Sequence, residues 1–235
     1  MLFLLFVLLR SWADPLEAQE FPPKQLSEMG LFESIKRQDP KANLIPYTVN
    51  SPYWSDGTHK TRFILVPNKK KIIFSSHGNF EFPTETILIK NFYLDLVLNN
   101  PSSRTIIETR LFVKSSINDS WKGYSYQWNE EGSEAFLLTG SKTTTFVVET
   151  PADPSPGFFL QDYYFPSRND CLSCHTKAAG RVLGIRASQL NRRMDNNQNQ
   201  LELLEKAGIF SKQLPNDLDK LPLLPNPFDP KTSLE

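Results

Sequence analysis

The chain of 235 residues lacks an excess of charge of either sign, because 26 Lys and Arg residues balance 26 Asp and Glu residues. This balance gives no sign of binding to nucleic acid or to an acidic membrane surface. Glycine is scarce, with 10 residues against 18 prolines, which indicates many rigid loops and few long helices. Long apolar runs are missing too: residues 2–9 are apolar without a break, but a bilayer span needs about 20 residues. We therefore predict no membrane span.

The hydrophobic content of 39% and the aromatic content of 12% are enough for a real core. The length fits one large or two small domains. The short apolar run fits the core of a secretory signal, with Ser11 and Ala13 or Ala18 before the cleavage point, although no basic residue precedes it. We predict a signal peptide at residues 1–18 and a periplasmic or secreted protein. A buried N-terminal strand is the alternative.

Residues 19–44 are predicted to be a helical lead-in, with a short helix at 24–32 that Gly30 ends in a left-handed conformation. Residues 204–210 repeat the Leu, Gly and Phe of residues 26–32 in register, which indicates the same helix stop used twice. From about residue 45 to 166 the chain is rich in Ile, Val, Phe, Tyr and Thr between turn signals. This pattern is typical of an antiparallel β-sandwich or barrel. The predicted strands are 61–67, 71–75, 86–98, 104–115, 121–129, 134–139, 143–150 and 157–165.

Residues 167–235 lose the strand pattern and are predicted to be a mostly helical segment with a Pro-rich tail. The predicted fold class is thus α+β, with a β domain at 45–166. Within this domain Lys90, like Lys70 and Lys71, is predicted to be a solvated edge residue.

Both cysteines fall in one motif, Cys171-Leu-Ser-Cys174-His175. This Cys-x-x-Cys-His order is the attachment sequence for a c-type haem. On a helix, positions i, i+3 and i+4 share one face, so two thiols can reach the vinyl groups of one porphyrin and the histidine its iron. A thioredoxin-like pair, half a zinc site and a disulfide are the alternatives. Zinc lacks further ligands, and no βαβ pattern accompanies the pair. We predict one covalent haem c, with His175 as the proximal ligand.

The sixth position of the iron is open. Met194 is the natural candidate, because His/Met ligation raises the potential of cytochromes c. His59, which could fold onto the haem from the β domain, and a vacant or water-filled position are the alternatives, while His77 is expected to be solvent-exposed.

Three arginines, Arg168, Arg181 and Arg186, flank the motif. A guanidinium group suits a carboxylate, so one or more of the three is a candidate partner of a haem propionate. Solvated surface arginines are the alternative.

Several stretches together resemble a family of exported bacterial c-type haem proteins. The stretches are residues 44–57, which contain Trp54-Ser-Asp-Gly57, with residues 60–63, 108–111, 123–129, 165–168, 180–186 and 189–191. The resemblance covers about residues 25–235 and implies a β-rich domain followed by a haem c segment. Members often lie beside, or are fused to, sugar dehydrogenases or other secreted domains, and many continue into a second Cys-x-x-Cys-His segment. This chain departs from them by having one such motif.

We therefore expect a monohaem electron carrier whose partner is a periplasmic redox protein or dehydrogenase, with a second haem domain on another chain as a further possible partner. The first alternative is an enzyme or sensor with an open iron that turns over peroxide or binds a gas. The second is a β domain that binds a glycan or a protein. Six aromatic residues could provide a stacking surface for the glycan, although such residues more often fill a core: Tyr53, Trp54, Trp121, Tyr124, Tyr126 and Trp128.

Overall fold

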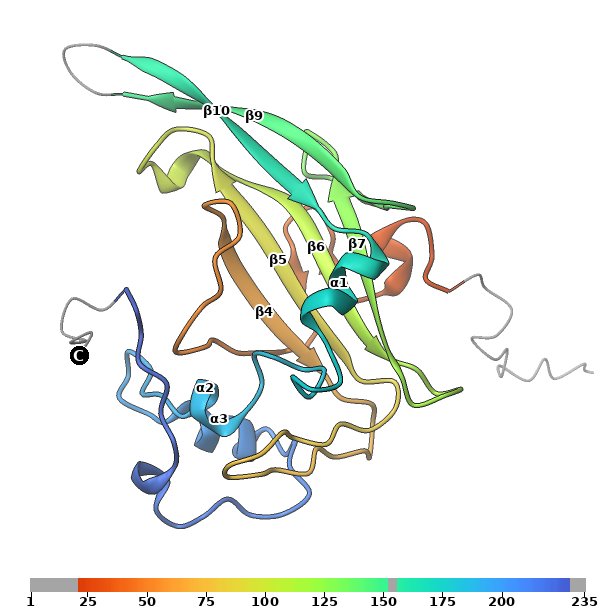
Figure 1. The fold of residues 1–235 in the computed structure, drawn as a ribbon, viewed down its shortest axis with the longest axis vertical. Coiled ribbons are helices and arrows are strands. Elements are labelled where there is room, and N and C mark those ends of the chain that lie inside the picture. The colour runs from red at the N-terminus through yellow and green to blue at the C-terminus, as the bar shows by residue number, and fades with distance from the viewer. Residues whose placement is uncertain (1–20, 152–155, 229–235) are drawn as a thin grey trace, which may run out of the picture.

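A computed structural model describes residues 21–151 and 156–228, so the predicted signal at 1–18 and the last part of the Pro-rich tail lie outside the described residues. The fold is β-rich, and its largest element is a six-stranded antiparallel sheet (Figure 1). The strands are β1 (Phe32–Ser34), β2 (Asp39–Pro40), β3 (Ile45–Pro46), β4 (His59–Leu65), β5 (Ile87–Asp95), β6 (Arg104–Lys114), β7 (Trp121–Trp128), β8 (Ala135–Leu137), β9 (Lys142–Thr150) and β10 (Gly157–Phe165). The helices are η1 (Leu26–Met29), η2 (Pro101–Ser103), α1 (Arg168–Cys174), α2 (Ala187–Leu190), α3 (Gln200–Lys206) and η3 (Leu218–Lys220).

The large sheet runs β3-β4-β5-β6-β7-β8, so each strand pairs with its neighbour in the chain. It is open at β3 and β8 rather than closed into a barrel. Strands β9 and β10 form a separate hairpin that crosses one face of the sheet (Figure 1). Seven of the predicted strands correspond to β4 to β10, because each run of β-branched and aromatic residues ends in a turn signal that the chain uses.

The predicted strand at 71–75 is wrong. Ile72 and Ile73 make only single bridges, to Phe210 and Glu81. The segment is extended, but it lies between two different partners, so no ladder forms.

One face of the sheet, which we call the outer face, is covered by the N-terminal segment. The strands contribute Ile89, Leu111 and Tyr126 to this layer, and Leu26 and Leu31 pack on them from the segment before β3. The Tyr126 hydroxyl donates a hydrogen bond to the Pro23 carbonyl at 2.9 Å, which ties the two layers together.

The other face, which carries Arg110 and Phe112 and which we call the motif face, has an apolar cluster at each end. At one end Phe92 packs with Tyr163 and Phe165 of the β9–β10 hairpin. At the other end the apolar sheet residues pack with the loop of residues 66–82 and with the C-terminal segment. This second cluster includes Ile64, Leu88, Phe112, Ile72, Phe80, Val182, Ile185, Leu190, Leu201 and Leu204. Residues on both sides of the predicted boundary at 166/167 therefore share one core.

The repeated helix stop is confirmed. Helix η1 ends at Gly30 with φ of 60°, and Gly208 follows α3 with φ of 72°. Both glycines adopt the left-handed conformation, which other residues rarely adopt. The leucine four residues before each glycine is buried, Leu26 at 0% exposure and Leu204 at 1%.

Candidate functional site

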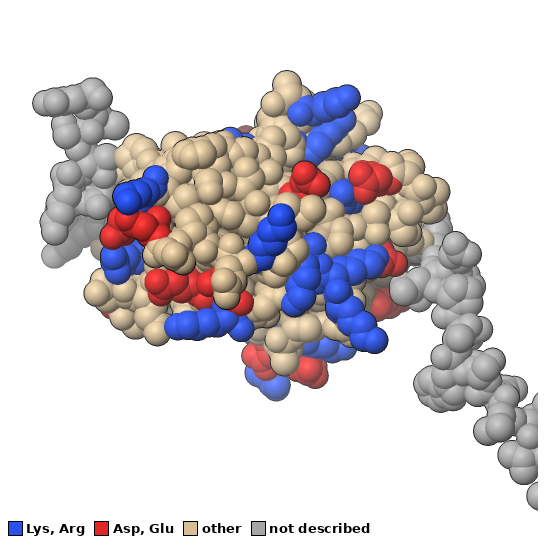
Figure 2. All heavy atoms as spheres, turned by 90° about the horizontal axis from the view of Figure 1, so that it is seen from below, with Lys and Arg blue, Asp and Glu red and all other residues tan. Residues whose placement is uncertain are grey.

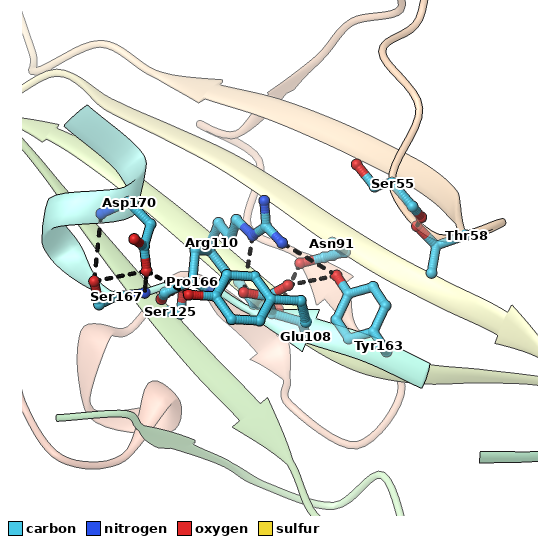
Figure 3. A network of polar contacts seen from close by, with 12 residues as sticks. Ser55, Thr58, Asn91, Glu108, Arg110, Ser125, Tyr163, Pro166, Ser167 and Asp170 are labelled. Atoms are coloured by element: carbon cyan, nitrogen blue, oxygen red, sulfur yellow. Dashed lines mark hydrogen bonds and ion pairs between the residues drawn. The ribbon is translucent and has the colours of Figure 1, made fainter. Parts of the chain in front are cut away.

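The Cys-x-x-Cys-His motif lies on α1, and a capping box sets where this helix begins. The Ser167 hydroxyl accepts a hydrogen bond from the Asp170 backbone N–H, and the Asp170 carboxylate accepts one from the Ser167 backbone N–H at 2.8 Å. The Ser167 hydroxyl also donates to this carboxylate at 2.7 Å, and this bond, together with the one from the Ser167 backbone N–H, lowers the pKa of Asp170. The Ser125 hydroxyl donates to the Pro166 carbonyl at 3.0 Å, so the start of α1 is fixed to β7 (Figure 3). The motif therefore has a defined position against the sheet.

Helix α1 lies close to β7 because the facing residue is a glycine. A Cβ atom on Gly123 would lie 2.7 Å from the Cys171 Cβ and 2.8 Å from its Sγ. Cys171 is partly buried, Cys174 is exposed, and neither forms a disulfide. Burial raises the pKa of the Cys171 thiol. Catalytic and redox cysteines have a lowered thiol pKa, so this environment disfavours the thioredoxin-like alternative.

His175 caps the end of α1, and its ring packs on Phe112 with 4.3 Å between ring centroids. Its Nδ1 lies 2.5 Å from the Arg181 carbonyl oxygen. A carbonyl can only accept, so Nδ1 carries the proton and Nε2 has a free lone pair. Arg181 has φ of 63°, and its Nη1 donates back to the His175 carbonyl at 2.9 Å. Desolvation, with Lys90 and Arg110 nearby, lowers the pKa of His175, so the neutral ring that binds a metal is favoured.

The structure separates the candidates for the sixth ligand. Met194 is partly buried beside the Thr48 hydroxyl, and it lines a cavity of about 430 Å³ together with Lys60 and Arg62. It therefore lies beside β4, two strands or about 10 Å from the β6 position of Phe112 on which His175 packs. His59 begins β4 on the outer face, where its Nε2 lies 3.2 Å from the Asp95 carboxylate.

His77 is exposed in the loop before Phe80, as expected. His59, on the outer face of the sheet, is not brought to the motif.

Of the three flanking arginines, Arg168 reaches the outer side of β7, where its guanidinium lies 4.8 Å from the centre of the Tyr124 ring. Arg181 is occupied with the His175 backbone, as described above. Arg186 is half-buried; its Nη2 donates weakly to the Ala179 carbonyl at 3.4 Å, and its buried Nε has no partner among the described residues. Only Arg186 thus retains an unused buried donor.

A buried ionic network beside the motif was not predicted. Glu108 has no exposed surface, and its two oxygens accept from Arg110 Nε at 2.8 Å and from the Tyr163 hydroxyl at 2.5 Å (Figure 3). The Arg110 guanidinium also lies 4.3 Å from the centre of the Phe92 ring. Burial and the Glu108 carboxylate raise the pKa of Tyr163. The network joins β6 to the hairpin and fixes the direction of the Arg110 side chain.

The prediction for Lys90 is wrong. Lys90 lies in the middle of β5, an inner strand of the sheet, and it is partly buried. Desolvation and the like charges of Arg62 and Arg110 lower its pKa to about 7. Figure 2, seen from the α2–α3 end, shows a group of Lys and Arg side chains near the middle of this view, with Asp and Glu scattered around it.

The possible glycan surface is mostly core. Tyr124, Tyr126 and Trp128 are at most 5% exposed, and Trp121 stacks on Phe112 with 4.9 Å between ring centroids. Tyr53 and Trp54 remain exposed, at 54% and 75%. Two neighbouring rings in one loop are a small part of the predicted surface.

Two further findings concern the described ranges only. No helix within them is long and apolar enough to span a membrane. No group of three or more His, Cys, Asp or Glu side chains there could hold a metal ion. Comparisons with protein-family models, curated proteins and solved structures give no match to this chain.

Proposed function

We propose that the chain is a c-type haem protein, in which Cys171 and Cys174 carry one covalent haem and His175 is its proximal ligand. Each thiol would add across one vinyl group, forming a C–S and a C–H bond with no leaving group. The observation that carries the proposal is the His175 hydrogen bond: Nδ1 donates to the Arg181 carbonyl, and Nε2 is available. A ligating histidine almost always donates its other ring N–H in this way, because the bond fixes the tautomer and the ring direction.

Within this class, the function best supported is that of a monohaem electron carrier. The bound group would supply a single iron that cycles between its ferric and ferrous states. Cys174 is exposed and Leu172 beside it is 37% exposed, so one attachment point lies at the surface, where a docking partner can approach. A periplasmic dehydrogenase or another haem protein is the expected partner, in line with the export that the sequence predicts.

The identity of the sixth ligand separates this function from the alternatives. Met194 lies on the same side of the sheet as the motif, whereas His59 does not. Ligation by Met194 would close the iron and limit it to electron transfer. An open position would instead allow peroxide turnover or gas binding, which is the second candidate because Met194 and His175 lie two strands apart.

The test is expression of the full chain in a host with haem c maturation, followed by a haem-stained denaturing gel and absorption spectra. We expect stain on the wild type and none after Cys171→Ala combined with Cys174→Ala. Ser173→Ala is the matched control, because Ser173 is exposed on the same helix. Absence of stain on the wild type would refute the proposal.

Low-spin spectra that turn high-spin in Met194→Ala would support the electron carrier. High-spin spectra in the wild type would support the enzyme or sensor. A low-spin spectrum that Met194→Ala leaves unchanged would return attention to the histidines.

A further inference from the structure

Three cations stand in one row across the motif face. Arg62 on β4 is directly opposite Lys90 on β5, and Lys90 is directly opposite Arg110 on β6. The row lies between the two apolar clusters of this face, one residue pair away from Phe112, on which His175 packs. It spans about 10 Å from Arg62 to Arg110, since neighbouring strands lie about 4.8 Å apart. We call these three residues the cationic row.

The cationic row is poorly compensated. Like charges directly opposite each other destabilise a sheet, and partial burial adds to this cost because it reduces screening by water. Arg62 is only 9% exposed. Glu108 is the one carboxylate paired with the row among the described residues, and it is bound to Arg110. Neither Arg62 nor Lys90 has a side-chain hydrogen bond there.

A ligand with two negatively charged groups would remove this cost. The proposed cofactor, haem, is such a ligand. A haem has two propionate carboxylates on an edge of the macrocycle other than the one the cysteines take. Two of the three flanking arginines are less suitable, because Arg168 lies over the Tyr124 ring and Arg181 is bound to the His175 carbonyl. Arg186 has an unused Nε, but this nitrogen is buried among the described residues. The cationic row faces the side of the sheet on which the motif lies.

We propose that Arg62 and Lys90 bind the two propionates of the haem, an assignment that rests on the proposed function. Arg110 is assigned no propionate, because its Nε donates to the Glu108 carboxylate and its Nη2 to the Tyr163 hydroxyl. The shared chemistry is carboxylate binding, and the same row could take a free dicarboxylate instead. The experiment below separates these two sources.

The test compares the unfolding of wild type and Lys90→Met in two forms of the full chain, without haem and with haem attached. Without haem, loss of an uncompensated cation should lower the unfolding equilibrium constant about threefold. With haem, loss of a charged hydrogen bond should raise it about tenfold. This reversal of sign is specific, because a merely structural lysine would act in the same direction in both forms.

The matched control is Lys122→Met, which removes an exposed lysine from the outer face of β7 and should change both forms equally. Equal effects of Lys90→Met in both forms would overturn the proposal. Arg62→Gln is the second variant, used in the same way if Lys90→Met does not accumulate with haem.

Succinate is the probe for a free dicarboxylate. It should stabilise the haem-free wild type, have less effect on haem-free Lys90→Met, and leave the haem-loaded wild type unchanged. Equal stabilisation of the loaded and haem-free forms would mean that haem does not occupy the row, and would overturn the assignment. If the wild type acquires no haem at all, the proposed function fails, whereas succinate binding that depends on Lys90 would still identify the row as a carboxylate site.

Discussion

Gly123→Ala tests whether α1 lies against the sheet as described. The added Cβ would lie 2.7 Å from the Cys171 Cβ and 3.8 Å from Phe112 Cδ2. The first distance is far inside van der Waals contact with a helix that is itself fixed at Ser167. Overpacking of this kind costs about 1–3 kcal/mol. The smaller entropy of an unfolded chain with alanine in place of glycine offsets about 0.4–1 kcal/mol, so a net loss of about 1–2 kcal/mol is expected.

Gly140→Ala is the matched control, because a Cβ at this position meets no heavy atom within 4 Å. Neither glycine has a positive φ, so the same entropic gain applies to both. Urea unfolding of the haem-free chain, followed by tryptophan fluorescence, should give a lower midpoint for Gly123→Ala than for Gly140→Ala, with the same slope. The same variant should accept less covalent haem. Equal midpoints for the two variants would refute the close packing of Cys171 on Gly123.

Three further outcomes are expected. The free energy of unfolding of the haem-free chain should rise between pH 7 and 8.5, because Lys90, with a pKa lowered to about 7, loses over this range a proton that the unfolded chain keeps. The slope should approach the limit of about 1.4 kcal/mol per pH unit for one proton, and Lys60, whose pKa is lowered to about 8, adds to the rise above pH 8. A flat profile in urea titrations, or an undiminished rise in Lys90→Met, would contradict this. Ser167→Ala should lower the free energy of unfolding by about 1 kcal/mol in the same titration, because the helix cap is lost. Asn169→Ala, which changes an exposed residue of the same helix, should have no such effect. Equal losses in the two variants would count against the capping box. Tyr163→Phe leaves one oxygen of buried Glu108 without its donor and should lower the free energy of unfolding by about 1–3 kcal/mol. Tyr164→Phe, on the exposed side of β10, is the control. If Tyr163→Phe lowers the free energy of unfolding no more than Tyr164→Phe does, the network is not stabilising.

The strands β4 to β10 could be predicted because their signals are local, whereas the two-residue strand β3 was not predicted. Turn residues bound each run of β-branched and aromatic residues, and the glycines at 30 and 208 could be assigned to helix ends for the same reason. The segment at 71–75 has the same composition as a strand. It fails because a strand also needs a continuous partner, and Ile72 and Ile73 face different segments.

The residues of the candidate site also fall into two groups, those with a local sequence signal and those whose role depends on the fold. Cys171, Cys174 and His175 could be identified because their chemistry depends on spacing within five residues. The carbonyl that orients His175 could not, because it depends on the left-handed backbone of Arg181. The cationic row could not be predicted either, since it depends on the register of three strands. One sequence signal did indicate that Lys90 is not a solvated edge residue: residues two apart in a strand share a face, so Lys90 lies on the same side as the apolar Leu88 and Phe92.

The shared core of the motif face bears on the order in which the chain can fold while it is made. Thr48 and Gln200, 152 residues apart, hydrogen-bond each other, and Leu201 and Leu204 complete the cluster around Ile64. Contacts of such long sequence separation form late. As the chain is made from its N-terminus, Cys171 and Cys174 therefore precede the residues that close this core. Under the proposed function, we expect the two thiols to be open to a haem-attaching enzyme during that interval.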